Sequence, residues 1–302
     1  MTERDAKNQE GKNMAVRFVI CSTADFPYDE AQEKNITFLP LQITFGEEYL
    51  RDVLDISNRE FYEKLIESDV LPKTSQIPPV EFEAAFRKII EDGDEAIAIT
   101  ISDKLSGTAQ SANIAAAEFP GRVFTVNSRS ACIGEQILIR YAMQLAEQGL
   151  CAADIAQKLE DTKGEVRLIA LLDTLEYVKK GGRISAATAF AGGLLSIKPV
   201  VAIEDGEVKI IGKARGSKQG NNLLREMVKK SGGIDFSRPF MLAYSGLSDN
   251  LLQKYIADSK ELWEGHADDI SICTIGSTIG TYAGPGAVAL AYFAPGGAEQ
   301  KD

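Results

Sequence analysis

Short apolar segments, bounded by polar residues and glycines, alternate along the first half of the chain with segments whose apolar residues recur every three to four positions. The short segments predict strands and the longer ones predict helices: strands at residues 16–21, 36–44, 96–101 and 123–126, helices at residues 59–67, 79–90, 108–117 and 132–148. Because strands that alternate with helices form parallel sheets, the pattern predicts an N-terminal parallel sheet wrapped by helices. Ligand sites of such sheets lie at the carboxyl ends of the strands.

The second half of the chain has strands and helices in a less regular order. Strands are predicted at residues 166–171, 199–203, 208–211, 240–244, 270–275 and 287–292, and helices at residues 174–180, 218–230 and 251–262. The segment Glu204-Asp205-Gly206-Glu207 predicts the turn of a β-hairpin. We therefore predict a disordered extension over residues 1–13, an N-terminal α/β domain over residues 14–160 and a C-terminal mixed α/β domain over residues 161–298.

Composition narrows the classes of partner. The chain has 33 Lys and Arg against 44 Asp and Glu, a net charge of −11, which repels nucleic acid and anionic membranes at long range. No apolar run is long enough to span a bilayer, so stable membrane insertion is not expected. The four cysteines form no C-x-x-C pair, which argues against a zinc site and a disulfide framework and favours a cytoplasmic location.

Loops rich in hydroxyl groups and glycine carry the candidate chemistry. They contain Thr74, Ser106, Gly107, Arg183 and Tyr282. Hydroxyls and free backbone N–H groups are good donors to a carboxylate or a phosphate. The single histidine of the chain is distant in sequence from all of these loops. We therefore predict an anion-binding site with no catalytic residue, no metal and no cofactor.

Each loop also has a plain structural interpretation. Ser106 or Thr108 can act as the N-cap of the helix that follows. The two glycines before Arg183 can end a helix whose last turn carries lysines. Apolar residues at helical spacing, as in residues 186–195, more often mark a packed core than a ligand tunnel. Arg215 can be a solvated charge at the end of the predicted hairpin.

Enzyme motifs are absent or incomplete in the sequence. Residues 206–213 resemble a phosphate-binding loop but have one residue too many, and Ala214 stands in the place of the required Ser or Thr. Residues 284–289 resemble a dinucleotide fingerprint but lie too near the end of the sequence for a βαβ unit. A nucleophile elbow and a zinc helix are both missing.

Five segments nevertheless occur in a recognisable order. They are residues 74–82 (Thr-Ser-Gln-Ile-Pro-Pro-Val-Glu-Phe), 105–112 (Leu-Ser-Gly-Thr-Ala-Gln-Ser-Ala), 175–185 (Leu-Glu-Tyr-Val-Lys-Lys-Gly-Gly-Arg-Ile-Ser), 195–200 (Leu-Ser-Ile-Lys-Pro-Val) and 280–287 (Gly-Thr-Tyr-Ala-Gly-Pro-Gly-Ala). Together they resemble the DegV family of bacterial fatty-acid-binding proteins, over nearly everything after Met14. The resemblance implies a two-domain α/β protein with the EDD fold.

The resemblance also implies a ligand and a partner. One long-chain fatty acid is expected between the domains, with its acyl chain buried and its carboxylate near the surface. Carried over by motif, Thr74 and Ser106, with Gly107, hold the carboxylate, while Arg183 and Arg215 serve the headgroup end or a kinase-facing surface. In family members that act as fatty-acid-kinase B subunits, a separate ATP-dependent kinase subunit phosphorylates the bound acid to an acyl phosphate. Catalysis is then expected on that partner.

Further residues follow from this reading. Phe190 and Leu194 are expected to line a closed apolar tunnel, because a fatty-acid tail must exclude water along most of its length. The chain departs from the family at Tyr282, where His is common, and at Asn127, where Asp is common. Since a phenol O–H can donate to a carboxylate, Tyr282 is expected to act as a neutral headgroup donor.

Two other functions stay open. A phosphotransferase domain related to dihydroxyacetone kinase would share the EDD fold but would need a histidine at the site, and His266 is poorly placed by sequence. A lipid-responsive interaction protein without a kinase partner is the third possibility.

Overall fold

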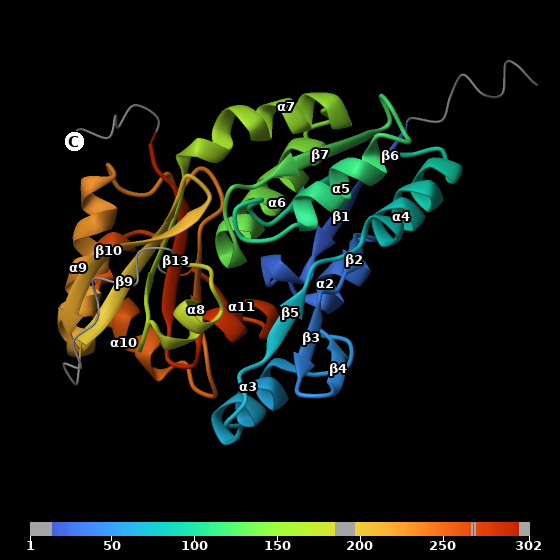
Figure 1. Ribbon diagram of the computed structural model, residues 1–302. Helices are drawn as coiled ribbons and strands as arrows, with labels where there is room; N and C mark the ends of the chain where they lie inside the picture. The colour runs from blue at the N-terminus through green and yellow to red at the C-terminus, as the bar shows by residue number, and fades with distance from the viewer. Residues whose placement is uncertain (1–13, 185–196, 267, 269, 296–302) are drawn as a thin grey trace, which may run out of the picture.

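The computed structural model describes residues 14–184, 197–266, 268 and 270–295. Two large sheets with their helices form most of the molecule, and a small third sheet lies beside the first (Figure 1). The predicted extension over residues 1–13 and the apolar segment 186–195 lie outside the described residues.

The first sheet is parallel throughout, as predicted, in the order β2-β1-β6-β7. Its strands are β1 (Val16–Cys21), β2 (Thr37–Leu39), β6 (Glu95–Thr100) and β7 (Val123–Asn127). Both faces are covered: α4 (Pro79–Glu91) and α5 (Thr108–Ala116) pack on one, and α6 (Cys132–Glu147) and α7 (Ala152–Thr162) on the other. Since successive side chains of a strand point to opposite faces, burial on both sides explains the continuous apolar runs.

The predicted strand over residues 36–44 is wrong as a single element. Its first part is β2, and the chain turns at Pro40 into β3 (Gln42–Phe45), which belongs to an antiparallel sheet of order β4-β3-β5. That sheet also contains β4 (Glu48–Arg51) and β5 (Lys73–Ser75), neither of which the pattern predicted. Thr74 therefore lies on a short strand and not in a loop.

Short helices complete the N-terminal half. The helix α3 (Asn58–Glu67) begins with a capping box between Ser57 and Glu60, which explains its well-predicted start. The structure adds α2 (Tyr28–Glu33) and the 3₁₀ turns η1 (Ser22–Ala24) and η2 (Lys163–Glu165).

The second large sheet has the order β10-β9-β8-β13-β11-β12, and only the β11–β12 pair is parallel. Its strands are β8 (Val166–Leu171), β9 (Ile197–Glu204), β10 (Glu207–Arg215), β11 (Met241–Tyr244), β12 (Ser271–Thr274) and β13 (Val288–Phe293). The β9–β10 hairpin is confirmed. Its turn residues Asp205 and Gly206 have φ of 52° and 81°, the conformation that an Asp-Gly turn favours.

Helices α9 (Gly216–Lys230) and α10 (Asn250–Asp258), followed by the turn η4 (Lys260–Leu262), cover the outer face of this sheet. The inner edge carries α8 (Glu176–Lys180) and α11 (Ser277–Ala283), which lie between the two large sheets in Figure 1. The sequence pattern predicted a loop where α11 lies, so Tyr282 belongs to a helix.

The helix α6 joins the two halves of the molecule. Its buried residues Ile133, Ile137 and Leu138 belong to a single apolar cluster that includes side chains from both large sheets. The predicted boundary at residue 160 falls in the last turn of α7, just before β8 begins.

Candidate functional site

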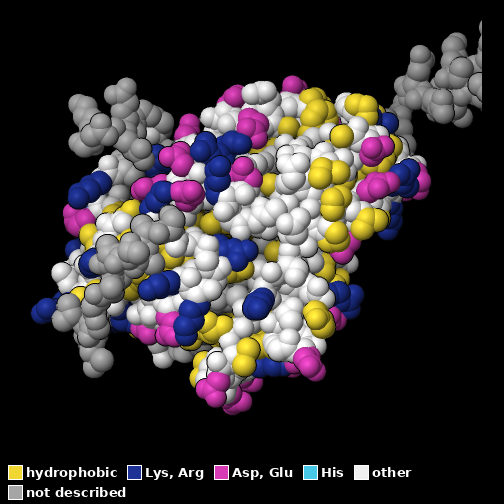
Figure 2. Space-filling model, viewed as in Figure 1, with side chains coloured by type: hydrophobic (Ala, Val, Ile, Leu, Met, Phe, Trp, Pro, Cys, Tyr) yellow, Lys and Arg dark blue, Asp and Glu magenta, His cyan; other side chains and the backbone are white. Residues whose placement is uncertain are grey.

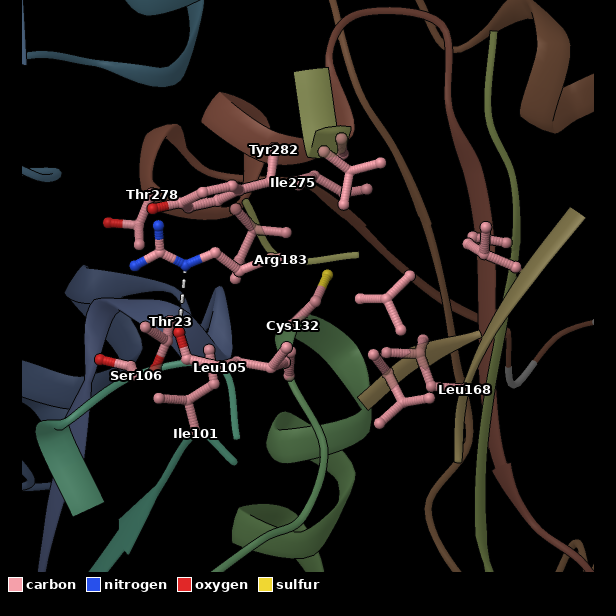
Figure 3. A pocket seen from close by; sticks show the side chains of 18 of the residues that line it. Thr23, Ile101, Leu105, Ser106, Cys132, Leu168, Arg183, Ile275, Thr278 and Tyr282 are labelled. Carbon is pink, nitrogen blue, oxygen red and sulfur yellow. Dashed lines mark hydrogen bonds between the residues drawn. The ribbon is translucent and has the colours of Figure 1, made fainter. Parts of the chain in front are cut away.

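A cavity of about 280 Å³ lies between the two large sheets. Most of its lining is apolar, and it comes from the ends of β1 and β6, the start of α6, strands β8 and β9, and helix α11. In Figure 3, Tyr282, Arg183 and Ser106 lie in the left half of the view, Leu168 lies at the right toward the strands of the second sheet, and Cys132 lies between them. The cavity thus has a polar end and an apolar end.

Four side chains form the polar end. The hydroxyls of Thr74 on β5 and Tyr282 on α11 are 2.7 Å apart and share a hydrogen bond. The guanidinium of Arg183 lies 4.9 Å from the centre of the Tyr282 ring, and its Nε donates to the carbonyl of Leu105 at 3.3 Å (Figure 3). Ser106 follows Leu105, so both domains contribute donors to the same spot.

The loop that carries Ser106 depends on a glycine. A Cβ at Gly107 would lie 1.9 Å from Oε1 of Gln76, so the Gln76 side chain can keep its position only because residue 107 is a glycine. Gln76 lines the cavity and donates from Nε2 to Oγ of Ser111 at 3.1 Å. The sequence reasoning missed Gln76 as a site residue, although it directly follows Thr74-Ser75 in the same segment.

The N-cap interpretation of this loop is only partly right. Gly107 is the N-cap of α5 and makes no side-chain cap. Ser106 Oγ accepts from the backbone N–H of Thr108 at 3.3 Å and lies 2.9 Å from Thr108 Oγ1. The serine hydroxyl therefore supports the loop, and Ser106 is also one of the residues that line the cavity.

Buried carboxyl groups lie behind the cavity wall. Thr23 donates from Oγ1 to Glu135 at 3.2 Å, and Thr278 donates from N and Oγ1 to Asp52 at 3.1 and 2.5 Å. Burial raises the pKa of Glu135 and of Asp52, and it raises the pKa of Asp25 to about 8. Thr23 and Thr278 therefore use their hydroxyl protons on these carboxyls.

Most of the predicted ligand contacts meet at one place. Thr74, Ser106, Gly107, Arg183 and Tyr282 all line the cavity. Thr23, Gln76 and Thr278 line it too and were not among the predicted ligand contacts.

The remaining predicted residues lie elsewhere. Arg215 ends β10, is exposed and is not among the residues that line the cavity, so its expected role at the headgroup end or on a kinase-facing surface stays a prediction. Phe190 and Leu194 lie outside the described residues. His266 stacks on the Phe236 ring at 3.8 Å between ring centres and does not line the cavity, so the histidine that a phosphotransferase would need is missing from this site.

No helix in the described part of the chain is long and apolar enough to cross a membrane. The described residues also contain no cluster of His, Cys, Asp or Glu that could hold a metal ion.

The fold and the cavity define a two-domain α/β protein with a largely apolar cavity between its two large sheets. A family model described as an uncharacterised protein of the DegV family matches residues 15–295, so the chain belongs to the DegV family. A DegV domain-containing protein of Deinococcus radiodurans is 32% identical over 282 residues, covering 92% of this chain and 98% of that protein.

Two solved structures show the same fold. A fatty-acid-binding DegV family protein from Thermus thermophilus is 31% identical, with a TM-score of 0.83 over 93% of this chain and 100% of its own. DegV, a fatty acid binding protein from Bacillus subtilis, is 27% identical, with a TM-score of 0.77 over 93% of this chain and 100% of its own. The predicted family and the predicted two-domain α/β fold are therefore confirmed.

Proposed function

We propose that this protein binds one long-chain fatty acid in the interdomain cavity and presents its carboxylate to a separate ATP-dependent kinase subunit. The observation that carries the proposal is the polarity of the cavity, which is apolar along most of its wall and polar at one end. Each buried methylene of an acyl tail contributes about 0.8 kcal/mol, so such a wall favours a long chain. The fatty-acid-binding relatives support the same ligand class.

The polar end suits a carboxylate. Arg183 supplies a positive charge, while Ser106 and the Thr74–Tyr282 pair supply hydroxyl donors. Hydrogen bonds to a charged acceptor are about twice as strong as neutral ones, so a few donors suffice. Tyr282 takes the place of the histidine common in the family and acts as a neutral donor.

The lining also supports a binding role without catalysis. Among the described residues that line the cavity there is no His, Asp or Glu, the usual general acids and bases. The phosphoryl transfer is therefore assigned to the kinase partner. Exposed Lys179 and Lys180 in the last turn of α8 lie close in sequence to Arg183, and Figure 2 shows dark-blue side chains over this part of the face. Positive charge beside the carboxylate stabilises the negative charge of an incoming phosphoryl group.

A cytoplasmic location belongs to the same proposal, because the kinase step needs ATP. The four cysteines are free, as expected for a reducing compartment.

The direct test is to purify the protein, extract its ligand and identify it by mass spectrometry. A stoichiometric long-chain fatty acid supports the proposal, and a ligand-free protein that also fails to bind oleate or palmitate in calorimetry refutes it. Ser106→Ala is expected to raise the Kd, since a lost donor to a charged acceptor costs about 1.5–3 kcal/mol.

A matched control for this variant is Ser248→Ala. Ser248 Oγ accepts from the N–H of Asn250 at 3.3 Å, the same local bond as in Ser106, but at the start of α10 and away from the cavity lining. If both variants bind equally well, Ser106 has only a structural role. The kinase step is tested by acyl phosphate formation with a bacterial fatty acid kinase subunit.

A further inference from the structure

The turn of the β9–β10 hairpin contacts the N-terminal domain. Ser102, two residues after the end of β6, donates from Oγ to the backbone carbonyl of Gly206 at 2.7 Å, and this bond is buried. The guanidinium of Arg129, two residues after the end of β7, lies 3.1 Å from the carboxylate of Asp205. We call these two interactions the hairpin contact. In Figure 1 the yellow hairpin points its tip toward the green segment that follows β7.

Charge complementarity supports the contact. Three of the four turn residues, Glu204-Asp205-Gly206-Glu207, are acidic, and they face Lys104 and Arg129. Hydrogen bonding to Lys209 and, less strongly, the charge of Lys104 lower the pKa of Glu207. Asp205 is 90% exposed, so its ion pair contributes little. The buried Ser102 bond therefore contributes most of the stability of the contact.

The hairpin contact closes one side of the cavity. Ile101, which precedes Ser102, lines the cavity from the N-terminal domain. Ile203 and Val208, which flank the turn and pair with each other across the hairpin, line it from the other domain. Moving the turn away from Ser102 separates these apolar walls.

The opposite side of the cavity is held much more firmly. Five side chains of the N-terminal domain are hydrogen-bonded to α11 or to the segment before it. The pairs are Ser22–Thr278, Asp25–Gly276, Asp52–Thr278, Tyr62–Ile275 and Thr74–Tyr282. By comparison, β10 is the edge strand of its sheet and its turn has one buried interdomain bond. Local opening of a protein occurs most readily in regions that have few buried contacts.

We propose that the hairpin contact is a gate, and that a fatty acid enters and leaves the cavity when the β9–β10 turn separates from Ser102. The gate rests on the proposed fatty-acid ligand. It concerns the rate of exchange and leaves the carboxylate contacts unchanged.

A disulfide tests the gate directly. A Cβ at Gly206 would lie 3.6 Å from Cβ of Ser102, within the range of about 3.5–4.5 Å that a disulfide needs. The variant combines Ser102→Cys and Gly206→Cys with Cys151→Ser, which removes the one exposed native cysteine. After loading with a fluorescent fatty acid and oxidation, exchange is expected to slow roughly tenfold or more and to recover on reduction. Equal exchange rates in the two redox forms refute the gate.

A second variant avoids the strain of a non-glycine residue at position 206. Ser102→Ala removes the buried bond and is expected to speed exchange by about twofold to tenfold. Its control is Ser128→Ala, because Ser128 is also buried at the end of the neighbouring strand but its hydroxyl bonds to Ser130 within the same loop. Equal rates in Ser102→Ala and Ser128→Ala contradict the gate. A parent protein that binds no fatty acid at all refutes the proposed function itself, so the two failures are distinguishable.

Discussion

Replacing Tyr282 with Phe tests the polar end of the cavity most sharply. The change removes the hydroxyl that lies 2.7 Å from Thr74 Oγ1 and keeps the ring against which Arg183 packs at 4.9 Å. If the hydroxyl donates to the bound carboxylate, its loss costs about 1.5–3 kcal/mol, and the Kd of oleate rises roughly 12- to 150-fold. If it only orients Thr74, the cost is about 0.5–1.5 kcal/mol and the Kd rises roughly 2- to 12-fold.

Titration calorimetry on delipidated protein measures this difference. Tyr282→Leu is the companion variant, since it also removes the ring and with it a cation–π contact worth about 0.5–1 kcal/mol. Tyr282→His is expected to restore binding with a new pH dependence near the ordinary imidazole pKa of about 6.5. A Kd for Tyr282→Phe equal to that of the parent refutes the reasoning, and the other donors then hold the carboxylate alone.

Three further results are expected. Burial raises the pKa of Asp25 to about 8, so the folded protein keeps a proton that the unfolded chain releases above about pH 4. Stability therefore falls as the pH rises through this window, and Asp25→Asn should reduce the fall in melting temperature between pH 5 and pH 8. Gly107→Ala displaces the Gln76 side chain and should weaken fatty-acid binding in calorimetry, while the melting temperature shifts little because that side chain is flexible. Arg183→Ala should weaken fatty-acid binding, whereas Arg215→Ala should keep the parent Kd and reduce only acyl phosphate formation with a kinase. An equal loss of fatty-acid affinity in both variants contradicts these separate roles of the two arginines.

The elements that the sequence predicted well are those with strong local signals. The apolar strand β8, the capping box of α3 and the Asp-Gly turn after Glu204 each follow from neighbouring residues alone. The division of residues 36–44 into two strands was missed, although Pro40 gave a signal, because a proline cannot donate to a central strand ladder. The polar three-residue strand β5 has too few residues for a visible alternation.

Local sequence signals also explain which residues of the candidate site could be named from the sequence. Ser106 and Tyr282 belong to motifs, so their positions could be carried over from the family. Thr278 and Gln76 were missed because their roles depend on partners distant in sequence, namely Asp52 and Gly107. Likewise α11 is rich in Thr and Gly, which are poor helix formers, and it is stabilised by tertiary bonds that a local pattern does not contain.

The packing of α6 has a consequence for the way this architecture can evolve. Because one helix completes the apolar interior of both large sheets, neither half possesses a full interior without it. A chimera that combines the halves of two relatives would pack α6 of one protein against the second sheet of the other. Close-packed protein interiors tolerate such mismatched side chains poorly. The two halves are therefore constrained to change together.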